Sequence, residues 1–291
     1  MRHRSFALTP LLSLLVSGAL TACPASPPAA EPAPSEAPAK AARSPAPATQ
    51  GPAKLAPTEP PAAPDPYPDA AAGIHYLEIM TGGAGPEDEV PMIVAIHGLG
   101  DEPKNFQHVL DAFPGRARVI LPRAIDDHEP GWSWFPIRAR SADVEGLSRG
   151  IEEAADAIAP AVAELANSRP TVGKPIVTGF SQGGMLTFAL AVRHPQQFSG
   201  AVAVGGWLPP PMWPESAPAD FPELVALHGD ADKAVKIQPT RDAVAHLSKL
   251  GVPVELHEYP GVGHAIPPAM RAELHQLLTA RLTKAAGVGT P

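Results

Sequence analysis

Six consecutive residues place a serine where it could act as a nucleophile. Residues 179–184 read Gly-Phe-Ser-Gln-Gly-Gly, so Ser181 lies at the centre of a G-x-S-x-G pattern. An apolar run precedes the pattern and another follows from Met185, which predicts a strand, a sharp turn and a buried helix. Such a turn is too tight for side chains two residues on either side of the serine, and it strains the serine backbone. An ordinary strand-to-helix turn is the alternative interpretation.

A serine nucleophile needs a base, and the base needs a carboxylate that orients it. After a turn of this kind the acid and then the histidine are expected at the ends of later strands. One later apolar run ends with Asp230 and Asp232, and the next ends in a glycine-rich turn with His264. Asp232 is the predicted acid. Asp230 is the alternative, although an aspartate in such a turn more often shapes the loop.

The other histidines are better explained by structural roles. His97 and His228 precede glycines at strand ends, His194 precedes a proline after the predicted helix, and His257 and His275 fall within regular elements. No set of His, Asp and Glu has metal-ligand spacing, so the sequence predicts neither a metal nor a cofactor.

Short β-branched runs alternate with helical patterns, which is typical of a largely parallel sheet. Strands are expected at residues 74–80, 92–96, 118–121, 175–178, 201–204, 223–227 and 252–258. Apolar residues at three- and four-residue steps predict a long helix from Val144 to Leu165 and a last helix from Pro268 to Leu282. Pro160 is expected to kink or interrupt the first of these helices.

Four motifs in this order resemble the phospholipase/carboxylesterase family of α/β-hydrolases, which includes the acyl-protein thioesterases. They are His-Gly-Leu-Gly-Asp at 97–101, Gly-Phe-Ser-Gln-Gly-Gly at 179–184, His-Gly-Asp-Ala-Asp at 228–232 and Gly-His at 263–264. The resemblance implies an α/β-hydrolase fold, with a mostly parallel central sheet flanked by helices. It extends from Ile74 to the last helix.

The resemblance also implies a role for each matching residue. Ser181 would be the nucleophile, Asp232 the acid and His264 the base, and the backbone N–H groups of Leu99 and Gln182 would form the oxyanion hole. The implied activity is that of a serine carboxylesterase, which cleaves carboxyl esters, lysophospholipids or thioesters through an acyl-enzyme.

Aromatic residues gather in two loops that follow predicted strands, at the sheet edge where α/β proteins bind ligands. Trp132, Trp134, Phe135 and Trp207 are therefore expected to form an apolar substrate-binding wall, and residues 131–136 resemble a cleft-lining loop of the family. The alternative is that these side chains only cover the core.

The N-terminal part has the pattern of an export segment. Residues 1–22 are expected to be a signal peptide, and Leu-Thr-Ala-Cys, ending at Cys23, resembles the lipobox of bacterial lipoproteins. Cys23 is the only cysteine, which favours lipidation over an incidental position after a plain signal peptide. Residues 23–72 are expected to form a disordered, Pro/Ala-rich tether, and residues 73–285 the hydrolase domain. The predicted location is the bacterial cell envelope, anchored by lipid at the outer membrane or cell surface.

Charge limits the classes of partner. The chain has 22 basic and 30 acidic residues and a formal net charge of −8, so no nucleic-acid partner is expected. A small-molecule or lipid ester is the expected substrate. Two alternatives stay open: a depolymerase or feruloyl-esterase-like hydrolase of polymer esters, and an inactive lipoprotein binding module.

Overall fold

The computed structural model describes residues 65–285, which are built around an eight-stranded sheet. The predictions on the signal peptide, on Cys23 and on most of the tether fall outside these residues. In sheet order the strands are β1 (Ala70–Ala71), β2 (Ile74–Thr81), β4 (Ala117–Pro122), β3 (Met92–Ile96), β7 (Ile176–Phe180), β8 (Gly200–Val204), β9 (Glu223–Gly229) and β10 (Val254–Tyr259). The pairings β1–β2 and β2–β4 are antiparallel, and all the others in this sheet are parallel. A separate hairpin joins β5 (Asp126–His128) and β6 (Gly131–Ser133).

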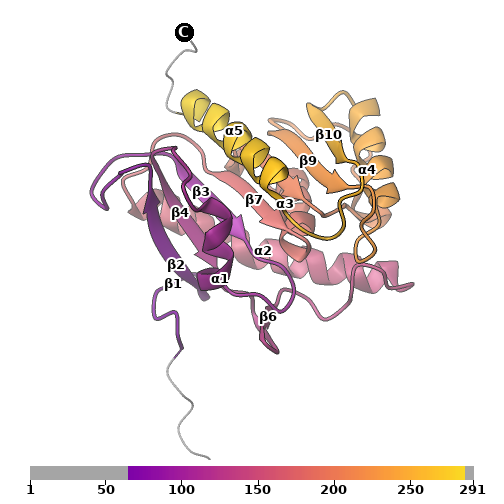
Figure 1. Ribbon diagram of the computed structural model, residues 1–291, viewed down its shortest axis with the longest axis horizontal. Coiled ribbons are helices and arrows are strands. Elements are labelled where there is room, and N and C mark those ends of the chain that lie inside the picture. Colours follow the sequence, from indigo (N-terminus) through magenta and orange to yellow (C-terminus); the bar gives the residue numbers. More distant parts are fainter. Residues whose placement is uncertain (1–64, 286–291) are drawn as a thin grey trace, which may run out of the picture. The chain divides into compact units, whose positions relative to one another are not determined.

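Helices cover both faces of this sheet. They are α1 (Pro103–Phe106), α2 (Val144–Ser168), α3 (Gln182–Arg193), α4 (Ile237–Lys249) and α5 (Pro268–Ala285), with short 3-10 turns η1 (Gln107–Leu110), η2 (Pro195–Gln197) and η3 (Pro210–Met212). Figure 1 shows α5 in front of the sheet and α2 behind it. None of the helices between residues 65 and 285 is long and apolar enough to cross a membrane.

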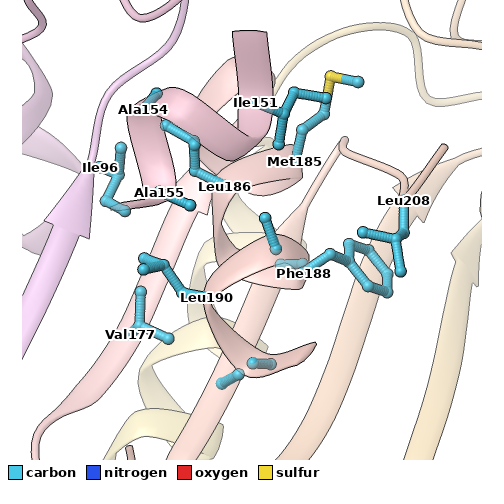
Figure 2. Close-up of a cluster of buried hydrophobic side chains, with 14 of the residues drawn as sticks. Ile96, Ile151, Ala154, Ala155, Val177, Met185, Leu186, Phe188, Leu190 and Leu208 are labelled. Carbon is cyan, nitrogen blue, oxygen red and sulfur yellow. The ribbon is translucent and has the colours of Figure 1, made fainter. Parts of the chain in front are cut away.

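The central strands are apolar on both sides because both sides are covered. In β7, Val177 belongs to the cluster that includes side chains of α2, α3 and α4, while its neighbour Ile176 belongs to the cluster with α5. In Figure 2 Ala155 of α2 lies beside Leu186 of α3, and Ile151 of α2 lies beside Met185; all four belong to one core cluster. The sheet is therefore a rigid support, and the loops at the carboxyl ends of its strands are held in fixed relative positions.

The fold class and the predicted strands are confirmed. Helix α4 was not predicted, because its polar face leaves few apolar residues at helical spacing. The interruption predicted at Pro160 is wrong, since α2 continues through this residue as one helix. Its neighbours Ala159 and Ala161 are buried, and so are Ile158 and Val162. Packing on both sides of the proline holds the helix together despite the missing N–H donor.

Residues before position 73, where the sequence places the start of the hydrolase domain, also take part in the fold. Tyr67 is 5% exposed, and its hydroxyl donates a hydrogen bond of 2.7 Å to Glu102. Strand β1 pairs with β2 immediately after it. The proline-rich composition of this segment does not show that it joins the fold. A single buried tyrosine, Tyr67, is enough to anchor it. Helix α5 ends at Ala285, the last of the described residues.

The start of α3 lies so close to β3 that only glycine fits between them. A Cβ atom at Gly183 would overlap the carbonyl oxygen of Ile96. We expect Gly183→Ala to lower the free energy of unfolding by about 3 kcal/mol, because backbone must move to relieve the overlap. Denaturant unfolding would measure this loss. The matched control is Gly85→Ala, where the nearest atom to the new Cβ is 3.9 Å away and a change below about 0.5 kcal/mol is expected. Equal effects of the two substitutions would contradict the close-approach argument.

Candidate active site

Ser181 occupies the predicted sharp turn between β7 and α3. Its backbone has φ 57° and ψ −115°, a conformation that residues other than glycine rarely adopt. Its N–H donates to the carbonyl of Val204 over 2.9 Å, which fixes the turn to the neighbouring strand. The glycines of the pattern are required as expected, because a Cβ at Gly179 would collide with the backbone of Gly183. The turn directs the serine hydroxyl away from the sheet.

A continuous chain of hydrogen bonds joins the three residues predicted to act together. The Oγ of Ser181 lies 2.9 Å from Nε2 of His264, and Nδ1 of His264 lies 2.6 Å from Oδ2 of Asp232. Because a carboxylate only accepts, Nδ1 carries the ring proton, and Nε2 is left to accept from the serine hydroxyl. This is the arrangement that a serine needs to lose its proton as it attacks.

The carboxylate of Asp232 is held rigidly. Its side chain is 2% exposed, and Oδ1 accepts the backbone N–H groups of Ala234 and Val235 over 2.8 and 2.9 Å. The alternative acid, Asp230, instead accepts the N–H of Gly261 over 2.6 Å. It thus shapes the loop that leads to His264, as expected of a turn-forming aspartate.

A second histidine lies behind the acid. Nε2 of His228 is 2.9 Å from the carbonyl of Val235 and 3.6 Å from Oδ2 of Asp232, and its Nδ1 is 2.9 Å from Oγ1 of Thr240. A carbonyl only accepts, so Nε2 carries its proton toward Val235. Oγ1 of Thr240 lies 2.9 Å from the carbonyl of Gly206 as well as from Nδ1 of His228, and its single hydroxyl proton bonds one of these two acceptors. The ring is fully buried, and burial lowers the pKa of His228. It is a neutral support for the Asp232 loop.

The turn at 97–101 is organised by His97. Its imidazole is buried, and Nδ1 lies 2.8 Å from the carbonyl of Gly98 while Nε2 accepts the N–H of Ala124 over 3.2 Å. Within residues 65–285 the backbone N–H groups of Leu99 and Gln182 have no hydrogen-bond acceptor. Gln182 is the first residue of α3, where helix N–H groups lack intrahelical partners. Both residues are thus able to donate to an oxyanion.

A cavity of about 250 Å³ opens above the serine. Its lining includes Ser181 and His264, together with Leu99 and Gln182. The proposed nucleophile, base and oxyanion donors therefore share one small space. Among the described residues, no three His, Cys, Asp or Glu side chains are grouped so that they could hold a metal ion.

The expected aromatic wall is not part of this cavity. Trp132, Trp134, Phe135 and Trp207 are all absent from its lining. Trp134 and Phe135 are each 2% exposed and Trp207 is 8% exposed, and all three belong to the core cluster that packs on α2 and α3. In this structure these three are core residues, which is the alternative that the sequence left open. Trp132 is half-buried beside Tyr67 and Arg123.

The loop that carries these aromatics instead supports the oxyanion turn. Gly100 donates its N–H to the carbonyl of Trp132 over 2.8 Å, and the indole of Trp134 donates to the carbonyl of His97 over 3.0 Å. The buried side chain of Gln182 joins the same loop, since its amide donates to the carbonyl of Phe135 over 2.9 Å and accepts the N–H of Trp134 over 3.0 Å. The two candidate oxyanion donors are therefore braced through one loop.

Five residues of the cavity lining were not predicted. They are Arg138, Ala139, Arg140, Ala234 and Val235. The first three form a turn just after the aromatic loop, and the other two lie beside Asp232 along the chain. In the sequence, the pair of arginines that follows the aromatic loop indicates this part of the lining. The aromatic side chains themselves lie in the core.

Comparisons with known proteins agree with this architecture. A family model described as phospholipase/carboxylesterase matches residues 81–281. The chain is 29% identical to carboxylesterase SOBER1 of Arabidopsis thaliana over 196 residues, which cover 60% of this chain and 83% of that protein. It is 26% identical to acyl-protein thioesterase 1 of Neurospora crassa over 223 residues, or 67% of this chain and 88% of that one.

Solved structures show the same fold. Acyl-protein thioesterase 2 of Zea mays superposes with a TM-score of 0.57 at 25% identity, covering 72% of this chain and 99% of that one. The esterase PE8 gives a TM-score of 0.62 at 24% identity, over 72% of this chain and 99% of the other. The second likeness concerns the fold alone. One relative, 25% identical over 201 residues, is a probable inactive carboxylesterase of Oryza sativa subsp. japonica.

Buried neutral histidines make the stability of this site depend on pH. Burial lowers the pKa of both His97 and His228, whereas in the unfolded chain a histidine titrates near pH 6.5. The unfolded state therefore binds protons first, so stability is fully present above about pH 6.5 and is lost as pH falls toward the lowered folded values. For each histidine, the free energy of unfolding changes by at most about 1.4 kcal/mol per pH unit.

Denaturant unfolding between pH 7.5 and 5.5 measures this effect. We expect His228→Gln, which keeps a donor but does not titrate, to lose about 1 kcal/mol less stability over that interval than the wild type does. His108→Gln, at a side chain that is 62% exposed, is the control and should follow the wild type. A His228→Gln slope identical to that of the wild type would show that the native fold does not exclude protons from this ring.

Proposed function

The chain belongs to the phospholipase/carboxylesterase family, and from this premise we propose that it is a serine esterase with Ser181, His264 and Asp232 as its catalytic triad. The observation that carries the proposal is the hydrogen-bond chain of 2.9 and 2.6 Å through the imidazole of His264. Its substrates are carboxyl esters, with thioesters and lysophospholipids in the same chemical range. Carboxylesterase and thioesterase relatives support this hydrolase activity.

The reaction proceeds through an acyl-enzyme. Ser181 Oγ bonds to the ester carbonyl carbon while Nε2 of His264 takes the hydroxyl proton, and the carbonyl oxygen becomes an oxyanion that accepts the N–H groups of Leu99 and Gln182. The carbon–oxygen bond to the alcohol then breaks, and His264 returns the proton to the leaving alcohol. Water repeats the sequence on the acyl-enzyme, with His264 as base, and releases the acid and the free serine.

Asp232 contributes by position and charge. It keeps the proton of His264 on Nδ1, so that Nε2 faces the serine, and it stabilises the imidazolium that forms during attack. The two backbone N–H groups that hold its Oδ1 prevent rotation of the carboxylate. His228 supports the same loop through the carbonyl of Val235.

Replacing the nucleophile tests the proposal directly. We expect Ser181→Ala to lower kcat/KM for 4-nitrophenyl butyrate by at least about 10⁴-fold, while the free energy of unfolding changes by less than about 1 kcal/mol. Ser248→Ala, at an exposed serine of α4, is the matched control and should retain full activity.

Labelling with a fluorophosphonate separates the remaining alternatives, because only an activated serine reacts quickly. Rapid labelling of Ser181 without turnover of small esters would favour a polymeric ester substrate. Neither labelling nor turnover by the folded protein would overturn the esterase proposal in favour of an inactive binding module.

We also propose that the chain is exported and anchored to the cell envelope by lipid at Cys23. The support is the sequence Leu-Thr-Ala-Cys after an apolar N-terminal segment, in a part of the chain outside residues 65–285. Two or more acyl chains would hold the protein at a membrane without a spanning helix. In a bacterial host, Cys23→Ser should abolish incorporation of labelled fatty acid and move the protein from the detergent phase to the aqueous phase. Unchanged incorporation would contradict lipidation at this residue.

A further inference from the structure

Two arginines lie in the cavity that holds Ser181. Arg138 and Arg140 are exposed and flank Ala139, and all three line the cavity with the serine and His264. No aspartate or glutamate is among the lining residues. The space beside the candidate nucleophile is therefore positive in charge, although the chain as a whole carries −8.

Neither arginine is neutralised by the protein. Within residues 65–285, Arg138 and Arg140 take part in no ion pair, whereas Arg193 and Arg241, which are also on the surface, are bound to carboxylates. A guanidinium presents a planar set of donors that suits the two oxygens of a carboxylate or the oxygens of a phosphate. The two side chains are available for such a group from outside the protein.

The turn that carries the arginines is held in place. The N–H of Ser141 donates to the carbonyl of Arg138 over 2.9 Å and closes the turn. Ile137 and Ala139 pack against the core cluster that includes α2 and α3. Just beyond the turn, Asp143 caps α2 by accepting the N–H of Gly146 over 2.8 Å. The backbone beneath both arginines is therefore anchored on either side.

A second segment of the lining, at Ala234 and Val235, has lysines next to it in the sequence. Ala234 and Val235 line the cavity between Lys233 and Lys236 in the sequence. Both lysines are exposed, and in the described part of the chain they form no ion pair with a carboxylate. The two lysines thus lie next to lining residues in the sequence, whereas Arg138 and Arg140 line the cavity themselves.

We propose that the substrate is an ester that carries an anionic group, a carboxylate or a phosphate, close to the scissile carbonyl, and that Arg138 and Arg140 bind this group. The inference rests on the proposed function, because it requires Ser181 to be the nucleophile. The anion takes no part in bond breaking. Its hydrogen bonds to the guanidinium groups hold the ester carbonyl over the serine, which raises kcat/KM for anionic esters above that for neutral ones.

Matched esters test this specificity and identify the position of the charge. The first pair is 4-nitrophenyl hydrogen adipate and 4-nitrophenyl hexanoate, which have acyl chains of equal carbon number with and without a carboxylate. The second pair is 1-butyrylglycerol 3-phosphate and 1-butyrylglycerol, in which the charge is on the alcohol. For at least one pair we expect kcat/KM to be higher for the anionic ester by about tenfold or more, as charge-assisted hydrogen bonds in an open site would give. The preference should shrink in 0.5 M salt, since these charges are accessible to ions.

Substitution of the arginines completes the test. The double variant Arg138→Ala, Arg140→Ala should bring the ratio of kcat/KM for the anionic ester to kcat/KM for the neutral ester close to one. The double variant Arg138→Lys, Arg140→Lys should retain part of this preference, because the charge remains but the bidentate geometry is lost. Arg149→Ala removes an exposed arginine outside the cavity lining and should keep the wild-type ratio. The ratio is taken within each variant, so differences in folded fraction cancel.

The possible failures are distinguishable. Serine-dependent hydrolysis of the neutral esters, with no anionic preference in either pair, would overturn the inference and leave the proposed function standing. A preference that survives both high salt and the double alanine variant would also overturn it. If the wild type hydrolyses none of the four esters, the inference is overturned, and the proposed function fails with it only if Ser181 also resists labelling by the fluorophosphonate.

Discussion

The contact between the start of α3 and the end of β3 is the constraint on which the site depends. Gly183 lies against the carbonyl of Ile96 with no room for a side chain. This contact makes the turn from β7 to α3 as sharp as it is, and the sharpness places Ser181 in its strained conformation at φ 57°. The strain is maintained because α3 is buried from Gln182 to Ala191, so the turn cannot relax without disturbing the core.

Sheet order then determines where the partners of the serine arrive. β7, β8, β9 and β10 are consecutive and parallel, so their carboxyl ends lie along one edge. Asp232 and His264 follow β9 and β10, and their loops converge on Ser181 over two and three strand spacings. On the other side, the loop at 131–136 ties the turn at 97–101 to Gln182 by backbone and amide hydrogen bonds. The nucleophile is thus positioned by packing, and the residues around it by hydrogen bonds between loops.

The parts of this arrangement that depend on local sequence were predictable. The elbow, the strands and the order of acid and histidine follow from glycine placement, β-branched runs and turn residues that are close together in the chain. The roles of Trp134, Phe135, Arg138 and Arg140 were not, because they depend on how one loop folds back over α3. An aromatic side chain after a strand has the same sequence pattern whether it faces a cavity or the core. Tertiary contacts decide between the two, such as the hydrogen bond from the Trp134 indole to the carbonyl of His97. Helix α4 was missed for a different reason: only four of its 13 residues are buried, so its apolar pattern is weak.

The cavity lining is positively charged and the whole chain is negatively charged. This difference determines whether charge selects a substrate during its approach or after it has bound. At physiological ionic strength charges are screened over about 8 Å, so an approaching anion is only weakly repelled by the net charge of the protein. Arg138 and Arg140 act at contact, on the bound ester and its transition state, rather than on the rate of encounter. The position of the substrate's charge then controls product release. An anion on the acyl side leaves a product acid with two negative groups beside the arginines, which slows its departure. An anion on the alcohol leaves with the alcohol when the acyl-enzyme forms. The product acid is released later and then carries only its own carboxylate.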